Sequence, residues 1–66
     1  MAVAKVIEVT ASSPKSFEDA IEKGVEKASE TLHGVRGAWV SEQSAIVEDG
    51  KVTEYRVTMR ISFLLD

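Results

Sequence analysis

A single dipeptide, Asp49-Gly50, places the strongest constraint on how this chain folds. It separates two β-rich runs, and this arrangement is among the strongest short-range signals for a β-hairpin turn. The predicted arms are Val35 to Glu48 and Lys51 to Leu65. Alternation is poor in the first arm, where a bulge between Ala45 and Val47 is expected. It is regular in the second arm, whose predicted core-facing residues are Tyr55, Val57, Met59, Ile61, Phe63 and Leu65.

A strand and a helix are predicted before the hairpin. Apolar side chains recur at every second residue from Val3 to Val9, and the polar stretch Thr10 to Ser13 is expected to end this strand. A helix is predicted over Ser16 to Leu32, because Asp19 follows the N-terminal serine by three residues as in a helix cap. Gly34 suits the left-handed position that ends a helix. The apolar stripe of the helix comprises Phe17, Ala20, Ile21, Gly24, Val25, Ala28 and Leu32.

These elements predict an α+β fold of β-α-β-β order, in which a three-stranded antiparallel sheet wraps around one helix in a single domain, residues 1–66. One helix covers only one face of such a sheet. The predicted opposite face carries Gly37, Trp39, Arg56 and Leu64. A tryptophan and a leucine on an uncovered sheet face are typical of a subunit interface or a ligand surface.

The small size of the chain predicts that it does not act alone. A domain of 66 residues buries only about 60 % of the surface of its unfolded chain, so its own core is marginal. Small domains are usually reinforced by disulfides, a structural metal or oligomerisation. The sequence has no cysteine and one histidine, His33, so oligomerisation is the remaining candidate.

Composition argues against several classes of partner. Eleven acidic residues stand against eight basic ones, giving a net charge of −3 without long blocks of either sign. Nucleic acid is therefore not expected as a partner. No apolar run approaches the roughly 20 residues of a membrane span, so no membrane partner is expected either. The first ten residues lack the apolar segment of a signal peptide, and the expected location is cytoplasmic.

No catalytic constellation is found in the sequence. It has neither a cysteine nucleophile nor a phosphate-binding loop, and its serines, acids and single histidine show no triad-like context. His33 is expected in the last helical turn, where its positive charge interacts favourably with the helix dipole. A capping role is therefore favoured over a role as a metal ligand or a catalytic base. The sequence therefore predicts that the protein is not an enzyme.

Taken in order, the chain resembles a known family. The resemblance rests on four segments in this order: the first strand, Thr10 to Pro14, the capped helix, and a hairpin that closes with Glu54 to Val57 and Ile61 to Leu65. The whole resembles the dodecins. This resemblance implies a hollow homo-oligomer of twelve subunits in which neighbouring sheets meet. In flavin-binding members, tryptophans stack on paired flavins and a glutamine contacts the ring edge.

The sequence departs from that flavin pattern at two positions. The family tryptophan falls at Gly37 and the family glutamine at Arg56. Trp39 lies two residues farther along, about 7 Å away on the same predicted face. The segments Val40 to Gln43 and Pro14 to Ser16 are more similar to the flavin-free branch of the family, which has a calcium-binding member. The candidate cofactor-binding residues are Trp39, Arg56, Gly37 and Gln43, and no metal ligands are assigned.

Two functions from different classes follow. The first is storage of a flavin (riboflavin, FMN or FAD), bound weakly around Trp39 and Arg56 of adjoining subunits. The second is a flavin-free shell that binds calcium or has a purely structural role. No calcium loop is present, because Glu48-Asp49-Gly50 is explained by its turn, although acids of several subunits can converge on a symmetry axis. The competing interpretation of Trp39 is an anchor between subunits, since aromatic anchors dominate protein contacts. The competing interpretation of Arg56 is an ion pair with an acid such as Glu42 or Glu54.

Overall fold

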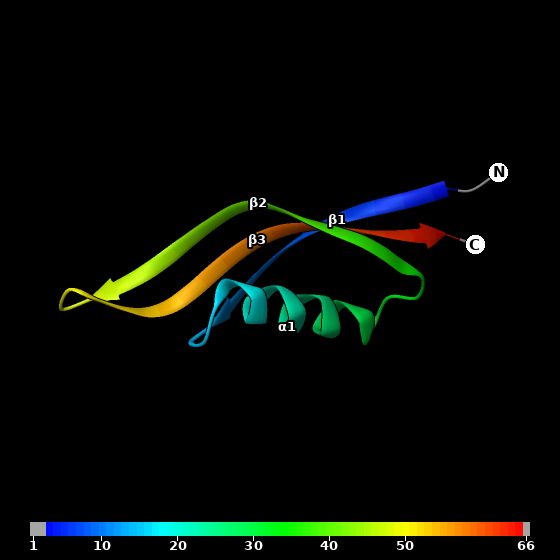
Figure 1. Ribbon diagram of the computed structural model, residues 1–66. Helices are drawn as coiled ribbons and strands as arrows, with labels where there is room; N and C mark the ends of the chain where they lie inside the picture. The colour runs from blue at the N-terminus through cyan, green and yellow to red at the C-terminus, as the bar shows by residue number, and fades with distance from the viewer. Residues whose placement is uncertain (1–2, 66) are drawn as a thin grey trace.

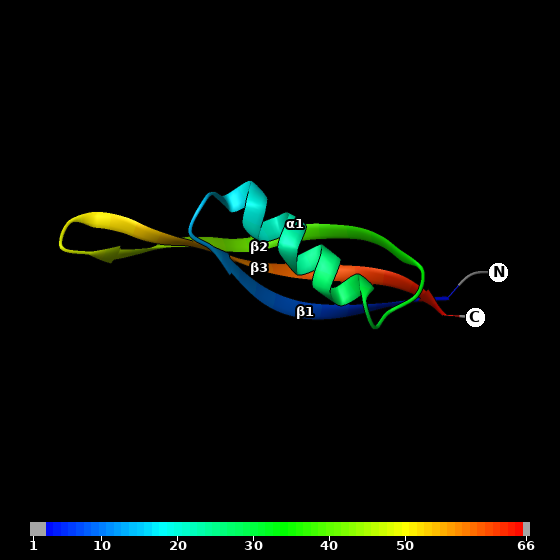
Figure 2. The ribbon, with the colours of Figure 1, turned by 90° about the horizontal axis from the view of Figure 1, so that it is seen from below.

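The computed structural model describes residues 3–65. Its elements are β1 (Val3–Ser13), α1 (Phe17–Ser29), β2 (Val35–Glu48) and β3 (Lys51–Leu65). The strands form one antiparallel sheet of three strands in the order β1-β3-β2. The helix lies along one face of this sheet, and the hairpin of β2 and β3 extends well past it (Figures 1 and 2). The predicted fold class is confirmed.

The junction between β1 and α1 is held by side-chain hydrogen bonds. Ser16 caps the helix as predicted, its Oγ accepting from the Asp19 backbone N–H at 2.9 Å. Ser13 is 1 % exposed, and its hydroxyl donates to the Asp19 carboxylate at 2.5 Å while accepting from the Lys15 backbone N–H at 3.0 Å. The expected strand end after Val9 is therefore wrong. β1 pairs with β3 through Ser13, because its small polar residues fit the ladder and the serine is satisfied beneath the helix.

Replacing Ser13 by alanine is expected to destabilise the subunit by about 1–3 kcal/mol, because the Asp19 carboxylate and the Lys15 N–H each lose a partner at a half-buried junction. Chemical denaturation at a fixed protein concentration measures the effect. Ser44→Ala, at an exposed position of β2, is the matched control and is expected to change stability by less than about 0.5 kcal/mol. Equal midpoints for the two variants would refute the assigned role of Ser13.

The C-terminal end of α1 differs from the prediction. The helix ends at Ser29, three residues before Leu32, although the Leu32 backbone N–H still donates to the Ala28 carbonyl at 3.0 Å. Gly34 has the expected left-handed backbone, with φ of 74°. It does not cap the helix, however, but turns the chain into β2, where its carbonyl accepts from the Leu64 N–H at 3.1 Å.

The core is a thin layer between α1 and the central strand. Phe17, Ile21 and Val40 pack around its centre, and Gly24 brings the helix close to the sheet, since a Cβ there would collide with the terminal methyl of Met59. β3 supplies most of the core, as the alternation predicted, but Tyr55 is only half-buried and Leu65, which was also predicted to face the core, is 48 % exposed at the end of the strand. The buried hydrophobic residues are Ala20, Val57, Met59, Ile61 and Phe63.

The hairpin turn is confirmed, while the register of its first arm is more irregular than predicted. Asp49 and Gly50 both have positive φ, 52° and 76°, as a two-residue hairpin turn requires. Register shifts lie between Val35 and Gly37, between Val40 and Glu42, and between Ile46 and Val47. Only the last was anticipated. An extra residue in a ladder reverses which face each later side chain occupies.

The isolated subunit is far from compact. Its extents are 52 × 19 × 13 Å and its radius of gyration is 13.5 Å, against about 11 Å for a compact domain of this length. Its accessible surface of 4835 Å² exceeds the roughly 4,100 Å² typical of a folded monomer of this mass. Between residues 3 and 65, no helix is long and apolar enough to cross a membrane.

Candidate ligand and assembly face

The face of the sheet that α1 leaves uncovered is called here the outer face. It is built from cross-strand rows to which β2, β3 and β1 each contribute one residue, because paired residues of an antiparallel sheet point to the same side. Four rows occupy its middle. They are Gly37–Ser62–Val6, Trp39–Arg60–Glu8, Glu42–Thr58–Thr10 and Ser44–Arg56–Ser12.

Trp39 is the most prominent side chain on the outer face, with 48 % of its surface exposed. The guanidinium of Arg60, its partner in the same row, lies over the indole with Cζ 5.8 Å from the ring centroid. Such a cation–π contact favours one orientation of both groups. The alternation along the second arm places Arg60 on the same face as Arg56, but sequence reasoning did not include Arg60 among the candidate site residues.

Arg56 occupies the same face but does not reach the tryptophan. Its row is four β3 residues from that of Arg60, about 13 Å by strand geometry. Its Nε donates a long hydrogen bond of 3.4 Å to Ser12 Oγ. Within residues 3–65, the ion pair found joins Lys27 and Glu30 and does not involve Arg56. Trp39 and Arg56 of one chain therefore do not form a single pocket.

Gly37 and Gln43 lie on different sides of the sheet. Gly37 is opposite Ser62 on the outer face, and a Cβ built there would lie 3.3 Å from Ser62 Oγ. Gln43 is opposite the buried Val57 and so belongs to the helix side. Grouping Gln43 with Trp39 as candidate cofactor-binding residues is therefore wrong, because the two side chains lie on opposite faces of the sheet. The bulge at Ser41, whose hydroxyl donates to the Thr58 carbonyl at 3.2 Å, reverses the alternation.

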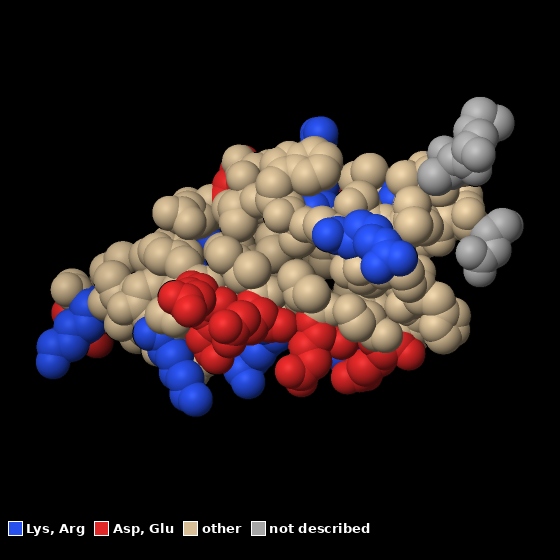
Figure 3. All heavy atoms as spheres, turned by 45° about the vertical axis from the view of Figure 1, so that its right-hand side comes forward, with Lys and Arg blue, Asp and Glu red and all other residues tan. Residues whose placement is uncertain are grey.

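The carboxylates are dispersed. Residues 3–65 contain no group of three or more histidine, aspartate or glutamate side chains placed to hold a metal ion. Four of the eleven acids line the exposed surface of α1 and its C-terminal cap, and Figure 3 shows acidic side chains along that side of the molecule; they are Glu18, Glu22, Glu26 and Glu30.

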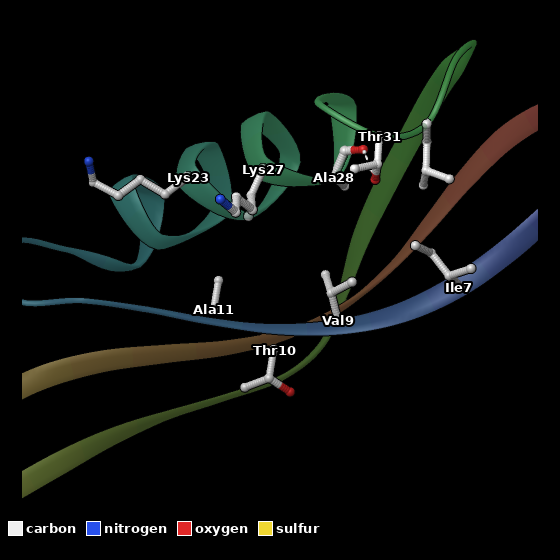
Figure 4. Close-up of a pocket in the computed structure, with 10 residues that line it drawn as sticks. Ile7, Val9, Thr10, Ala11, Lys23, Lys27, Ala28 and Thr31 are labelled. Carbon is white, nitrogen blue, oxygen red and sulfur yellow. Dashed lines mark hydrogen bonds between the residues drawn. The ribbon is translucent and has the colours of Figure 1, made fainter.

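A groove that sequence reasoning did not anticipate runs between α1 and β1, with a volume of about 640 Å³. We call it the α1–β1 groove (Figure 4). Its apolar wall is half-buried, and Lys23, Lys27 and Thr31 are exposed on its helix side. Thr31 Oγ1 donates a 3.5 Å bond to the Ala28 carbonyl. The residues forming the wall are Ile7, Val9, Ala11, Gly24, Ala28 and Leu32.

Comparison with known proteins identifies the family. The sequence model of the Dodecin family matches residues 3–66. The chain belongs to the dodecin family. Among curated relatives, this dodecin is 39 % identical over 64 residues to the protein named calcium dodecin from Mycobacterium tuberculosis, covering 96 % of this chain and 89 % of the relative.

Solved dodecin structures have the same fold. The dodecin from Streptomyces davaonensis superposes with a TM-score of 0.94 at 32 % identity, with 98 % of this chain and 96 % of that chain covered. The calcium-chelating calcium dodecin of M. tuberculosis, described as having a novel calcium-binding site, gives a TM-score of 0.84 at 35 % identity, with coverages of 97 % and 91 %. The resemblance read from the sequence is thereby confirmed.

Proposed function

We propose that this dodecin is a non-catalytic subunit of a closed homo-oligomer of about twelve copies, and that the outer face holds a small ligand between subunits. The observation that carries the proposal is the uncovered outer face, on which Trp39 is half exposed and oriented by Arg60. Aromatic and arginine side chains of this kind are the usual anchors of protein interfaces and ligand sites.

The shape of the subunit supports assembly independently. An elongated molecule with five buried hydrophobic residues among positions 3–65 has little core to offset the entropy of ordering its chain. Val3, Val6 and Leu65 are also about half exposed near the terminal end of the sheet. Burying these side chains against neighbouring copies supplies apolar contact that one subunit lacks. A cytoplasmic location stays a prediction.

The assembly is expected to form without any ligand, because the apolar surface that needs covering belongs to the protein itself. Multi-angle light scattering of ligand-free protein at micromolar concentration measures its mass. The expected mass is about twelve times that of the subunit. A folded, stable monomer at that concentration would contradict the proposal.

The ligand that suits the outer face best is a flat aromatic molecule such as a flavin, held by Trp39 and arginines of adjoining subunits. Tryptophan offers a large flat surface, and an arginine pairs with a phosphate or a ring carbonyl. Gly37 removes one wall of the flavin sandwich that the family resemblance implies. Native protein is therefore expected to bind riboflavin weakly. Absorbance of the purified protein and riboflavin fluorescence quenching test this binding.

Calcium is the second candidate ligand, favoured by the 39 % identity to calcium dodecin. Because the acids of residues 3–65 form no site within one chain, any calcium site joins subunits and stabilises the particle. At a concentration 100 times its Kd, calcium is expected to raise the free energy of unfolding by about 2.7 kcal/mol per site. Thermal unfolding with calcium should then occur several degrees higher than with a chelator or with equal magnesium. Identical melting under all three conditions would exclude this ligand.

A further inference from the structure

We propose that the α1–β1 groove receives the tip of the β2–β3 hairpin from a second copy of this chain. The inference rests on the proposed assembly and names one of its contacts. It joins two surfaces of the subunit that are each incomplete alone and that match in polarity and charge.

The groove is the acceptor surface. Its aliphatic wall is half-buried, so water still reaches side chains that packing of an apolar group would cover. Lys23 and Lys27 flank it on the helix, on the side of α1 nearest β1. The Lys27 side chain is 83 % exposed although it pairs with Glu30 at 3.4 Å. An apolar occupant with acidic groups at its edge fits this combination.

The hairpin tip is the donor surface. β1 ends at Ser13, opposite Tyr55, so residues 46–54 extend as a two-stranded ribbon with no third strand beside them. Isolated two-stranded ribbons are marginally stable in water. Val47 and Val52 pair across this ribbon with 59 % and 48 % of their surfaces exposed. The tip is acidic overall, because residues 46–54 contain the three acids Glu48, Asp49 and Glu54 against one lysine, Lys51, which lies opposite Glu48.

The two surfaces of one subunit cannot meet each other. The tip lies at one end of a molecule 52 Å long, beyond the N-terminal end of α1, while α1 and the part of β1 beneath it lie along the middle of the molecule (Figure 2). The contact is therefore between copies, and it joins different surfaces of the two partners. Contacts of this head-to-tail kind generate closed rings when the rotation between copies closes. They are consistent with a closed particle.

The absence of cysteine from the sequence allows a direct test by site-specific cross-linking. Lys27→Cys places a thiol beside the groove and Glu48→Cys places one at the tip. Both positions are exposed, so neither substitution removes a core side chain. Each single variant and the double variant are assembled, sized by light scattering, treated with a short bis-maleimide and separated under denaturing conditions.

The double variant is expected to give a ladder of covalently joined subunits, because every copy offers one groove thiol and one tip thiol. Each single variant is expected to remain uncross-linked. Particles of Lys27→Cys and Glu48→Cys subunits assembled together should give dimers and no longer products. The matched control is Glu22→Cys with Glu48→Cys, since Glu22 lies on the face of α1 turned away from the sheet, and it should give no ladder.

Particles of full size that give no ladder in the double variant would overturn the contact and leave the proposed assembly intact. If the unsubstituted protein stays monomeric, both the contact and the proposed assembly would be overturned. Single variants that cross-link as strongly as the double variant would show a symmetric contact instead. An anionic amphiphile found in the groove by native mass spectrometry of the purified particle would also overturn the proposal.

Charge reversal provides a second test that does not depend on cross-linker reach. Lys27→Glu and Glu48→Lys are each expected to shift the particle toward smaller species, and their combination is expected to restore full size. Lys27→Glu also opposes Glu30 at the end of its own helix, and Glu48→Lys also faces Lys51 across its own hairpin. Because the combination keeps both of these local repulsions, recovery of full size in the combination reports the contact between copies. Lys15→Glu, an exposed lysine outside the groove lining, is the control and should not affect size. A combination no larger than either single variant would overturn the contact.

Discussion

Replacing Phe63 by alanine is expected to unfold the subunit and dissociate the particle together. Phe63 is 8 % exposed and lies between Lys5 of β1 and Val35 of β2 in the ladder. Truncating a buried phenylalanine costs about 3–5 kcal/mol, because it removes apolar burial and leaves a cavity. A subunit with so small a core has little stability to lose, so folding and assembly should fail at the same denaturant concentration.

Circular dichroism and light scattering along one urea titration measure the two events. Arg36→Ala is the control, since Arg36 is exposed on β2 beside Val35, the ladder partner of Phe63. It is expected to cost less than half as much as Phe63→Ala. Assembled Phe63→Ala protein with an unchanged unfolding midpoint would show that this side of β3 does not carry the core.

The predictable part of the fold is the part governed by local pattern. The alternation along β3 places Val57 and Met59 in the core, and Asp49-Gly50 supplies the positive φ angles of the turn. The end of β1 was not predictable from local pattern. Thr10 to Ser13 read as a polar stop, but Ser13 is buried because Asp19, from the next element, satisfies its hydroxyl.

The outer face was partly predictable for a related reason. The two-residue alternation of a strand assigns Trp39, Arg56 and Arg60 to it correctly, but it does not reveal the contact between Arg60 and Trp39, which lie on different strands. The rule fails at Gln43, because the bulge at Ser41 depends on pairing with Thr58 and not on the residue types of β2 alone.

The α1–β1 groove was not predictable at all from periodicity. Lys23 and Lys27 lie outside the apolar stripe of the helix and are exposed, so the helical pattern alone assigns them only to a solvated face. Only the packing of α1 against the sheet, through Gly24 and Met59, shows that these lysines border the apolar α1–β1 groove. Such a site is defined by the distance between two elements, and no single segment of sequence encodes that distance.

The double substitution Gly37→Trp with Arg56→Gln is expected to tighten riboflavin binding more than tenfold. Gly37 is on the outer face in a strand, so a tryptophan there adds the stacking wall that the family resemblance implies. Aromatic pairing adds about 0.5–1.5 kcal/mol beyond area burial, and about 1.4 kcal/mol corresponds to tenfold in affinity. The second substitution replaces the Arg56 guanidinium, whose hydrogen bond to Ser12 is long at 3.4 Å. The glutamine amide in its place can contact the edge of the flavin ring.

Riboflavin fluorescence quenching by native and substituted particles of confirmed size measures the change. Gly37→Ala with Arg56→Gln is the matched control, because it adds a Cβ at the same 3.3 Å from Ser62 Oγ without adding a ring. It should bind no more tightly than native protein. Tight quenching by native protein, lost in Trp39→Phe, would show that Trp39 already supplies the stacking surface. Negligible quenching by native and double variant alike would show instead that neighbouring subunits close the outer face to flavins, which leaves calcium binding or a structural role for the particle.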